Sequence, residues 1–211
     1  MDARARGLPF YPYKNKEFYE FYGIMIGDGS LYHSRNCKYF FTISEGEYEY
    51  ALYIAGLAKL LTGKEIRIKY RAKAYRIEFK SKQLFNIFTT LGFPVGKKSD
   101  TIIIPSMLLE SNNINWIIRG IFDTDGSIFF SSKPGIKEYP TIEITSKSLT
   151  LLNQIGYVLQ KRYDIKSHLR KSDKAYKLAI YGRKQITKWI KFINSSHKRK
   201  SRLLARVVRR S

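Results

Sequence analysis

Cysteine, histidine and long apolar runs are scarce in this sequence. A single cysteine, Cys37, excludes an internal disulfide framework and any zinc site built from several cysteines. The three histidines, His33, His168 and His197, are too few and too scattered to indicate a zinc enzyme. No apolar run reaches the roughly 18 residues that span a membrane, and the start of the chain lacks a signal-peptide pattern. We therefore expect no membrane partner and an intracellular protein.

Acidic residues are also scarce. The 211 residues include 39 Lys and Arg against 17 Asp and Glu, which gives a net charge of +22 and a pI of about 10.0. Hydrophobic residues make up 44% of the chain and aromatic residues 15%, so it has the composition of a folded protein and not of a disordered basic tail. A folded chain this basic most often binds a polyanion, and nucleic acid is the first candidate. A solubilising surface or adaptation to heat is the alternative, although heat adaptation usually raises both signs of charge together.

The chain contains an internal duplication. Three pairs of segments align in the same order at nearly constant offsets: 28–30 with 125–127, 41–61 with 142–162, and 81–88 with 183–190. In the middle pair the apolar residues recur with the spacing of one buried helix face. The sequence therefore predicts two structurally similar repeats of about 100 residues each.

Each repeat has the same predicted order of elements. The expected elements are a helix (15–28, 112–125), two strands (30–45, 127–146), a helix (46–62, 147–162), two strands (65–71 with 74–80, 166–171 with 175–181) and a last helix (82–91, 184–195). The order αββαββα, with hairpin-length connections, predicts an α+β fold with antiparallel sheets. We expect the first repeat over 1–95, a connector over 96–111, and the second repeat with a basic tail over 112–211.

Basic side chains gather on one face of the predicted strands. In EIRIKYR, which begins at Glu65, apolar and cationic residues alternate, and successive side chains of a strand point to opposite faces. Like charges on neighbouring strands repel one another unless an anion covers them. A solvated sheet face is the alternative to a DNA-binding one. The predicted DNA-binding residues on the strands are Arg67, Lys69, Arg71, Arg76, Lys80, Lys166, His168, Arg170 and Lys177.

The tail from 197 to 211 combines seven Lys or Arg with a regular set of apolar residues. We expect a helix with one apolar stripe and a basic remainder. Two interpretations stay open. The helix either contacts phosphates, with Arg209 and Arg210 as DNA-binding residues, or packs against the second repeat as a cap.

Asp28 and Asp125 stand where a carboxylate is unfavourable. Each ends the first helix of its repeat, and the helix dipole places partial negative charge there. Small residues on these helices, Gly23, Gly27 and Gly120, would let the helices pack closely, so that the two carboxylates meet. A divalent cation would resolve their repulsion, because Mg²⁺ prefers carboxylate oxygens and accepts phosphate oxygens as further ligands. The structural alternative is a simple turn, which Asp-Gly commonly forms.

The two helix ends resemble a known motif. FYGIMIGDG, from Phe21, and IRGIFDTDG, from Ile118, resemble the two copies of the LAGLIDADG motif, and the repeat order is similar to that of LAGLIDADG homing endonucleases in their single-chain form. The resemblance covers about 15–194. It implies two pseudo-twofold-related repeats, each with a four-stranded saddle sheet, packed through the motif helices. It also implies a monomer that makes a site-specific double-strand break in a long DNA target.

The resemblance further implies a metal site. Asp28 and Asp125 would bind the divalent ions, and the backbone carbonyls of Gly27 and Thr124 would be further ligands. The implied ion is Mg²⁺, with Mn²⁺ as a substitute and Ca²⁺ as an ion that binds without supporting cleavage. Ile26 departs from the motif, which has its first Asp at this position, but that position is not a metal ligand.

Four further catalytic positions follow from the same resemblance. Polar groups that order water around the scissile phosphates fall on Glu45 and Ser146, which differ from the common Gln or Lys. A lysine before the last helix falls on Lys82 and Lys184. Independently of the family, both lysines lie at strand-to-helix junctions in matching places, where a cation would stabilise charge that develops on a phosphate.

Two other functions fit the same fold. One is an intron maturase that binds the host intron RNA, and the other is a DNA-binding regulator that does not cleave. Both tolerate loss of the motif acids, whereas this chain keeps Asp28 and Asp125. That retention favours the nuclease.

Overall fold

The computed structural model describes residues 15–34, 38–98 and 100–209. The first repeat contains α1 (Lys16–Gly27), β1 (Gly29–Ser34), β2 (Lys38–Glu45), α2 (Tyr48–Thr62), β3 (Ile68–Arg71), β4 (Ala74–Lys80) and α3 (Lys82–Thr90). A short helix, α4 (Ser106–Leu109), follows. The second repeat contains α5 (Ile114–Asp125), β5 (Gly126–Lys133), β6 (Ile136–Ser146), α6 (Leu149–Tyr163), β7 (His168–Ser172), β8 (Ala175–Tyr181) and α7 (Arg183–Phe192), and α8 (Lys198–Val208) comes last. The predicted αββαββα order is confirmed for both repeats.

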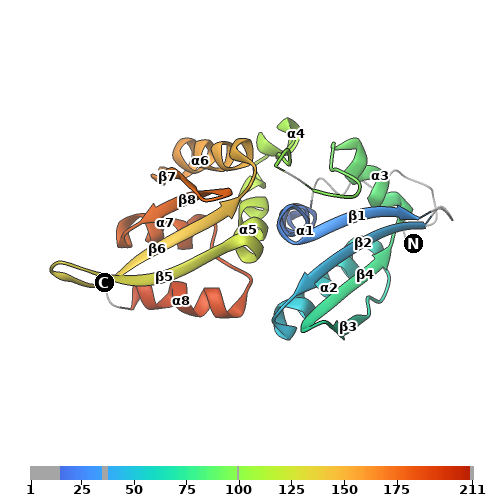
Figure 1. Ribbon diagram of the computed structural model, residues 1–211, viewed down its shortest axis with the longest axis horizontal. Helices are drawn as coiled ribbons and strands as arrows, with labels where there is room; N and C mark the ends of the chain where they lie inside the picture. The colour runs from blue at the N-terminus through green and yellow to red at the C-terminus, as the bar shows by residue number, and fades with distance from the viewer. Residues whose placement is uncertain (1–14, 35–37, 99, 210–211) are drawn as a thin grey trace, which may run out of the picture.

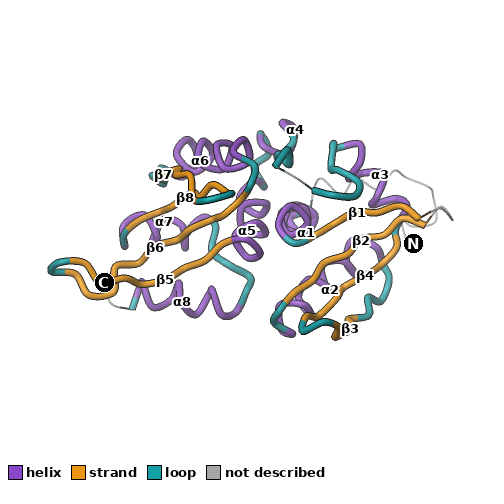
Figure 2. Tube along the Cα trace, viewed as in Figure 1, coloured by secondary structure: helices purple, strands orange, loops and turns teal. Residues whose placement is uncertain are grey.

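Each repeat forms one four-stranded antiparallel sheet. The strand orders are β1-β2-β4-β3 and β5-β6-β8-β7, so both sheets have the same topology. Helices α2 and α3 pack against one face of the first sheet, and α6 and α7 pack against the corresponding face of the second (Figure 2). The α+β fold with two matching sheets is therefore confirmed. The division of the chain at residues 95 and 111 stays a prediction.

Local sequence explains where these helices begin and end. In α2, the buried residues Tyr50, Ile54, Leu57 and Leu61 recur at helical spacing and face the sheet. The helix stops at Gly63, which adopts a φ of 68° that residues with a Cβ rarely take. Helices α3 and α6 are preceded by Ser81 and Ser148, whose hydroxyl oxygens accept a hydrogen bond from the backbone N–H three residues later. Each bond satisfies one of the free donors in the first turn of the helix.

The two motif helices, α1 and α5, lie side by side between the sheets (Figure 1). Glycines make this contact possible. A Cβ on Gly23 would collide with the backbone carbonyl of Ile117, and a Cβ on Gly120 would collide with the backbone of Glu20 and Ile24. The helices therefore touch backbone to backbone, as the small residues predicted.

The basic tail forms helix α8, which packs on α7 and β5 and buries Leu204 and Val207. It therefore caps the second repeat, as one of the two interpretations held. It also reaches the first repeat, because Lys198 and Arg199 form ion pairs with Glu49 and Glu47 at 2.8 and 2.6 Å. Arg209 is exposed at the end of α8, whereas Arg210 lies outside the described residues.

In the part of the chain that the structure describes, no helix is both long and apolar enough to cross a membrane.

Candidate active site and nucleic-acid interface

Asp28 and Asp125 both lie at a junction between a motif helix and the first strand of a sheet. Asp28 caps the C-terminus of α1, and its N–H donates to the carbonyl of Ile24 at 3.0 Å. Asp125 is the last residue of α5, and the next residue, Gly126, donates its N–H to the carbonyl of Phe122. Both carboxylates thus project from the negative end of a helix.

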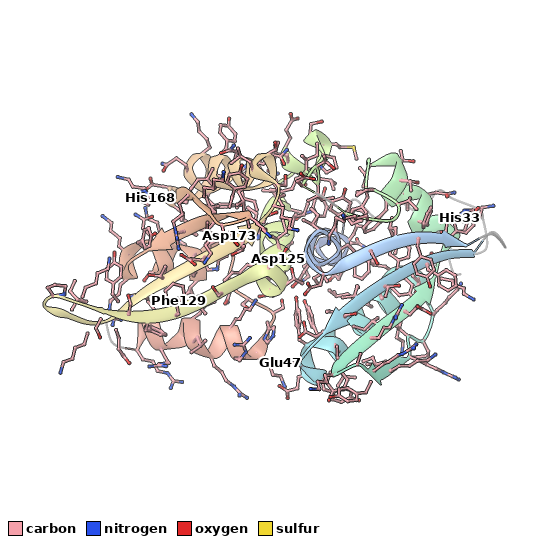
Figure 3. All side chains as sticks on the ribbon, viewed as in Figure 1. His33, Glu47, Asp125, Phe129, His168 and Asp173 are labelled. Carbon is pink, nitrogen blue, oxygen red and sulfur yellow. The ribbon has the colours of Figure 1, made fainter. Side chains whose placement is uncertain are left out.

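The two helix ends meet. A Cβ on Gly27 would collide with the side chain of Thr124 and would lie 3.4 Å from Oδ2 of Asp125. Figure 3 shows Asp125 beside α1, between the two sheets. Burial and the nearby charge of Asp28 raise the pKa of Asp125 from 3.8 to about 6, although Lys98 and Lys200 oppose this shift. Burial likewise raises the pKa of Asp28.

Two lysines that the sequence analysis did not select cap the motif helices. The ammonium of Lys98 donates hydrogen bonds to the carbonyls of Met25, Gly27 and Gly29, at 3.0 Å for Met25 and 2.9 Å for Gly29. The ammonium of Lys200 donates to the carbonyls at the end of α5, at 2.7 Å to Phe122 and 2.8 Å to Asp123. Burial lowers the pKa of each lysine to about 8, although neighbouring carboxylates favour its charged form. These cations offset the negative helix ends.

The duplication contains a signal for this pair. Lys98 and Lys200 differ by 102 residues, which is the offset of the last aligned segments, and each follows the last helix of an αββαββα unit. The sequences around the two lysines do not align, because Lys98 lies in a loop and Lys200 in a helix.

A buried polar network supports Lys200. The carboxylate of Asp123 accepts hydrogen bonds from the hydroxyl of Ser195 and from the N–H of Ser196, the latter at 2.7 Å. Glu20 of α1 accepts hydrogen bonds from the hydroxyl of Ser196 at 2.5 Å and from that of Tyr53 at 2.8 Å. Burial raises the pKa of Asp123 to about 7. The first acid of the second motif thus fixes the loop that leads into α8.

Glu45 and Ser146 lie near the motif carboxylates. Glu45 ends β2, and its pKa is raised by burial and also by the charge of Asp28. Ser146 ends β6 and lines a cavity of about 280 Å³ together with Gly27, Lys98 and Asp125. Their predicted roles around a phosphate stay predictions, but their positions fit those roles.

Lys82 and Lys184 are not brought to the motif carboxylates. Lys82 lies 5.9 Å from the ring of Tyr39, at the outer end of the β1–β2 hairpin, whereas Asp28 lies at the inner end. Lys184 is exposed near the start of α7, after the outer end of β8. The strand before each lysine runs away from the motif helices, and the role of both lysines beside a phosphate stays a prediction. Lys98 and Lys200 are the lysines whose charges act on the motif carboxylates.

The carboxylates fit a small divalent cation. Carboxylate and carbonyl oxygens are the ligands that Mg²⁺ prefers. Among the described residues, no Lys or Arg forms a direct ion pair with Asp28 or Asp125, and no cluster of three His, Cys, Asp or Glu offers another metal site. One predicted ligand is already engaged, since the Gly27 carbonyl accepts a hydrogen bond from Lys98.

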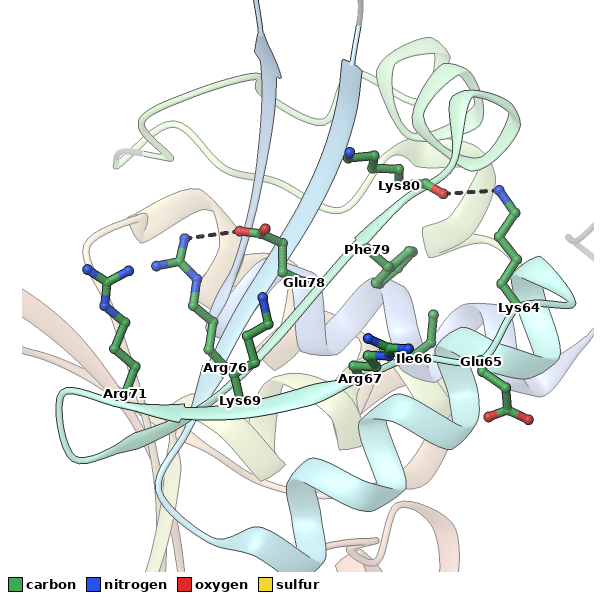
Figure 4. A pocket seen from close by; sticks show the side chains of 10 residues that line it. All are labelled: Lys64, Glu65, Ile66, Arg67, Lys69, Arg71, Arg76, Glu78, Phe79 and Lys80. Atoms are coloured by element: carbon green, nitrogen blue, oxygen red, sulfur yellow. Dashed lines mark hydrogen bonds and ion pairs between the residues drawn. The ribbon is translucent and has the colours of Figure 1, made fainter.

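The first sheet presents a cationic groove of about 520 Å³ on the side where β3 and β4 diverge (Figure 4). Lys69 and Arg76 are cross-strand partners within it. Arg76 forms an ion pair with Glu78 at 3.3 Å. The carboxylate of Glu78 also accepts a hydrogen bond from the hydroxyl of Tyr32 at 3.2 Å. All five cations predicted on this sheet line the groove: Arg67, Lys69, Arg71, Arg76 and Lys80.

The second sheet holds its cations differently. Arg170 and Lys177 are cross-strand partners, and both pair with the buried carboxylate of Glu143, at 2.5 and 3.2 Å. Burial alone would raise the pKa of Glu143, but hydrogen bonds from these two cations lower it. Lys166 and His168 are exposed near them on the chain. One buried acid therefore orders two of the predicted DNA-binding cations.

We expect Asp125→Asn to raise the melting temperature of the metal-free protein. The pKa of Asp125 lies above its ordinary value, so its ionised form is less favourable in the folded than in the unfolded chain. That penalty is absent below about pH 3.8, where the carboxyl is protonated in both states, and is complete above about pH 6. Melting curves in EDTA should therefore show a gain at neutral pH that shrinks towards pH 4. A clear drop at neutral pH would show that Asp125 is a structural turn residue.

Comparison with known families and structures agrees with the duplication. A family described as "WhiA LAGLIDADG-like domain" matches residues 17–91, and a family described as "LAGLIDADG-like domain" matches residues 112–194. Each match covers one repeat. Each repeat is therefore similar to a LAGLIDADG-like domain.

Solved structures of two kinds share the fold. The homing endonuclease I-WcaI bound to its DNA recognition sequence is 14% identical, with a TM-score of 0.65 over 89% of this chain and 86% of that one. I-DmoI in complex with DNA and Mn is 19% identical, with a TM-score of 0.62 over 85% of this chain and 97% of that one. Full-length DUF199/WhiA from Thermatoga maritima is 17% identical, with a TM-score of 0.60 over 97% of this chain and 63% of that one. At these identities the matches establish the fold alone.

Curated relatives are much longer proteins. A probable translation initiation factor IF-2 of Thermococcus kodakarensis is 26% identical over 209 residues, which are 97% of this chain and 16% of the relative. A replication factor C small subunit of Methanocaldococcus jannaschii is 26% identical over 204 residues, which are 92% of this chain and 10% of the relative. The chain thus spans a sixth or less of the length of these relatives.

Proposed function

We propose that this chain is a site-specific DNA endonuclease that makes a double-strand break by divalent-metal-dependent hydrolysis of phosphodiester bonds. One observation carries the proposal. Asp28 and Asp125 lie at the touching ends of two pseudo-twofold-related helices, without a direct cation partner among the described residues, and a sheet with ordered cations extends from each. A twofold arrangement of this kind suits a duplex, whose strands are themselves related by twofold symmetry.

Asp28 and Asp125 would hold the metal, with backbone oxygens beside them. When bound, Mg²⁺ supplies positive charge to the reacting phosphate and lowers the pKa of a coordinated water. Lys98 and Lys200 would place fixed ammonium groups next to the carboxylates and stabilise negative charge that develops on the phosphate. Glu45 and Ser146 would hold water near the two centres by hydrogen bonds.

The two cationic sheet faces would bind the duplex on both sides of the cut. Phosphate contacts by Lys and Arg supply affinity that depends on salt, and contacts to base edges in the major groove supply sequence preference. Glu143 would keep Arg170 and Lys177 in fixed positions, which reduces the entropy lost when they contact DNA. DNA is described in the structures of I-DmoI and I-WcaI that share this fold.

The curated relatives support a homing role. Their names describe an initiation factor and a replication factor subunit, which have no common activity, yet each contains a segment similar to nearly the whole of this chain. A self-contained segment shared by otherwise unrelated proteins is what a mobile element would leave. Homing by a double-strand break accounts for such a distribution.

Selection from a random duplex library would test the proposed function. The protein would be incubated with the library in Ca²⁺, and the enriched duplexes would then be offered with Mg²⁺. We expect one long sequence to be enriched and then cut on both strands. Enrichment without cleavage under any divalent metal would contradict the nuclease proposal.

A regulator that binds DNA without cutting is the second candidate. The WhiA-like match over 17–91 and the WhiA structure, which covers 97% of this chain, favour it. It predicts sequence-specific binding that does not depend on Asp28 or Asp125. The cleavage step of the same selection experiment separates the two candidates.

Base readout and phosphate anchoring should be separable in the first sheet and the tail. Lys69 on the edge strand β3 and Arg76 on β4 are cross-strand partners in the cationic groove. We expect Lys69→Ala or Arg76→Ala, one or both, to change base preference at one position by about 1–3 kcal/mol. Arg209→Ala and Arg210→Ala should weaken binding to all sequences alike and reduce the salt slope by about one each. Profiling each variant against singly substituted targets checks this. Uniform loss for the sheet variants, with shifted preference for the tail variants, would show that the wrong surface faces the DNA.

A further inference from the structure

Phe129 is an exposed aromatic residue on a polar face. It lies in the middle of β5 and keeps 41% of its surface exposed, whereas its neighbours Ile128 and Phe130 turn towards the core side. Because strand side chains alternate, Phe129 shares the open face with Ser127 and Ser131. Figure 3 shows it on β5.

The surroundings of Phe129 are polar and charged. Its cross-strand partner on β6 is Thr141, and Glu143, which orders Arg170 and Lys177, is the partner of Ser127. Among the described residues, no other aromatic ring and no cation is stacked on Phe129. Single exposed apolar side chains are common on protein surfaces, but this ring lies on the same open face as Glu143 and the two cations that it orders.

Its counterpart in the first repeat is engaged differently. Tyr32 stands at the matching position after the Asp-Gly-Ser segment. Its ring is stacked on Phe40 with centroids 4.6 Å apart, and its hydroxyl donates to Glu78 at 3.2 Å. The duplication therefore places an aromatic residue at the same point of both sheets, but only Phe129 presents a free ring without a polar group.

We propose that Phe129 reads a thymine through its C5-methyl group in the major groove of the target. This inference rests on the proposed function, since it needs DNA on the open face. The major groove exposes one apolar group, the thymine methyl, and contact with an apolar side chain such as Phe is a known way to recognise it. Serine and threonine neighbours leave space for the base edge, and Arg170 and Lys177 hold nearby phosphates or acceptors.

The geometry also places the thymine. Phe129 lies four residues beyond Asp125. Residues of a strand advance by about 3.4 Å each, so the ring lies roughly 14 Å along the strand from the carboxylate. At about 3.4 Å per base pair, this corresponds to about four base pairs from the phosphate at the second motif.

Thymine-to-uracil replacement tests the contact directly, because uracil lacks the methyl group and keeps every hydrogen-bonding group. Duplexes would be selected with the wild-type protein in Ca²⁺, and each thymine of the enriched sequence would then be replaced in turn. We expect one replacement, about four base pairs from the cut in the half-site of the second repeat, to weaken binding about fourfold, as loss of one buried methyl predicts. Phe129→Ser should weaken binding to the thymine target and abolish its preference over uracil at that position alone.

Leu169→Ser is the matched control. Leu169 belongs to the same sheet, is 38% exposed and lies on the opposite face, opposite the buried Leu178. It should keep the thymine preference. Melting curves of both variants show whether either substitution destabilises the fold. A folding defect would lower the affinity for thymine and uracil targets equally, whereas loss of the methyl contact would lower the affinity for the thymine target alone.

Two outcomes would overturn the inference alone, and a third would overturn it together with the proposed function. If Phe129→Ser keeps the same preference for thymine over uracil as wild type, the residue does not read the methyl, and the proposed nuclease stands. If no replacement in that half-site changes wild-type binding, the inference is again wrong by itself. Failure of the protein to enrich any duplex would overturn both proposals.

Discussion

Asp28→Asn and Asp125→Asn are each expected to abolish double-strand cleavage, with at least a 10²–10³-fold loss of rate, while DNA binding survives. Asparagine keeps the shape of the side chain but loses the charge that a divalent cation requires. Both carboxylates have a raised pKa because they are partly buried, and each also feels the lysines that cap the motif helices. Supercoiled plasmid carrying the selected target, followed on a gel with Mg²⁺, measures the two cuts separately.

Nicking of one strand by either variant agrees with this prediction, because the other carboxylate remains. Asp164→Asn is the matched control. Asp164 lies in the same repeat as Asp125, at the end of α6, where it is exposed and pairs with Lys188. Its φ of 51° is a conformation that Asn also tolerates. If both motif variants cut at wild-type rates, the assignment of these carboxylates to the metal is wrong.

Lys98→Met is expected to reduce cleavage by about 10²-fold, because it removes a preorganised positive charge beside a developing anion. Methionine keeps the apolar length of the side chain, so the change removes mainly the ammonium. Three carbonyls at the end of α1 lose their donor, and both motif carboxylates lose a nearby cation. Single-turnover cleavage of the selected target, with binding measured in Ca²⁺, separates the chemical step from affinity.

Lys97→Met is the control for this variant, because Lys97 is the preceding residue and is exposed. It should affect binding slightly and the cleavage step not at all. Lys200→Met should repeat the effect at the other centre with a larger loss of stability, since Lys200 is buried and bonds to two carbonyls. Wild-type cleavage by Lys98→Met would remove the two lysines from the proposed mechanism.

Most of the fold followed from periodicity and repetition. The apolar positions of α2 and α6, the alternation in β3 and β4, and the shared Asp-Gly-Ser segments each depend on residues that are neighbours in the sequence. Close packing of α1 on α5 was also predictable, because Gly23 and Gly120 have no other evident use in a helix.

The candidate site was less predictable, because its members come from different elements. Lys98 reaches the end of α1 across more than 70 positions of the chain, from a loop that carries no local pattern. Lys82 was selected because of its place before a helix, but the direction of β4 carries it to the far end of the sheet. The spacing of the repeats predicts the positions of the two carboxylates. The residues that surround them are determined by the tertiary structure, which the spacing does not show.

The backbone contact between α1 and α5 has a consequence for how such a protein can evolve. Because Gly23 and Gly120 bring main chain against main chain, the spacing between Asp28 and Asp125 depends on the peptide backbone and hardly on the surrounding side chains. The open sheet faces have no such restriction, and their residues are free to change without moving the helices. In the proposed nuclease, drift in the recognised sequence would therefore leave the stagger between the two cuts unchanged, so a lineage could acquire new targets while always producing the same kind of DNA end.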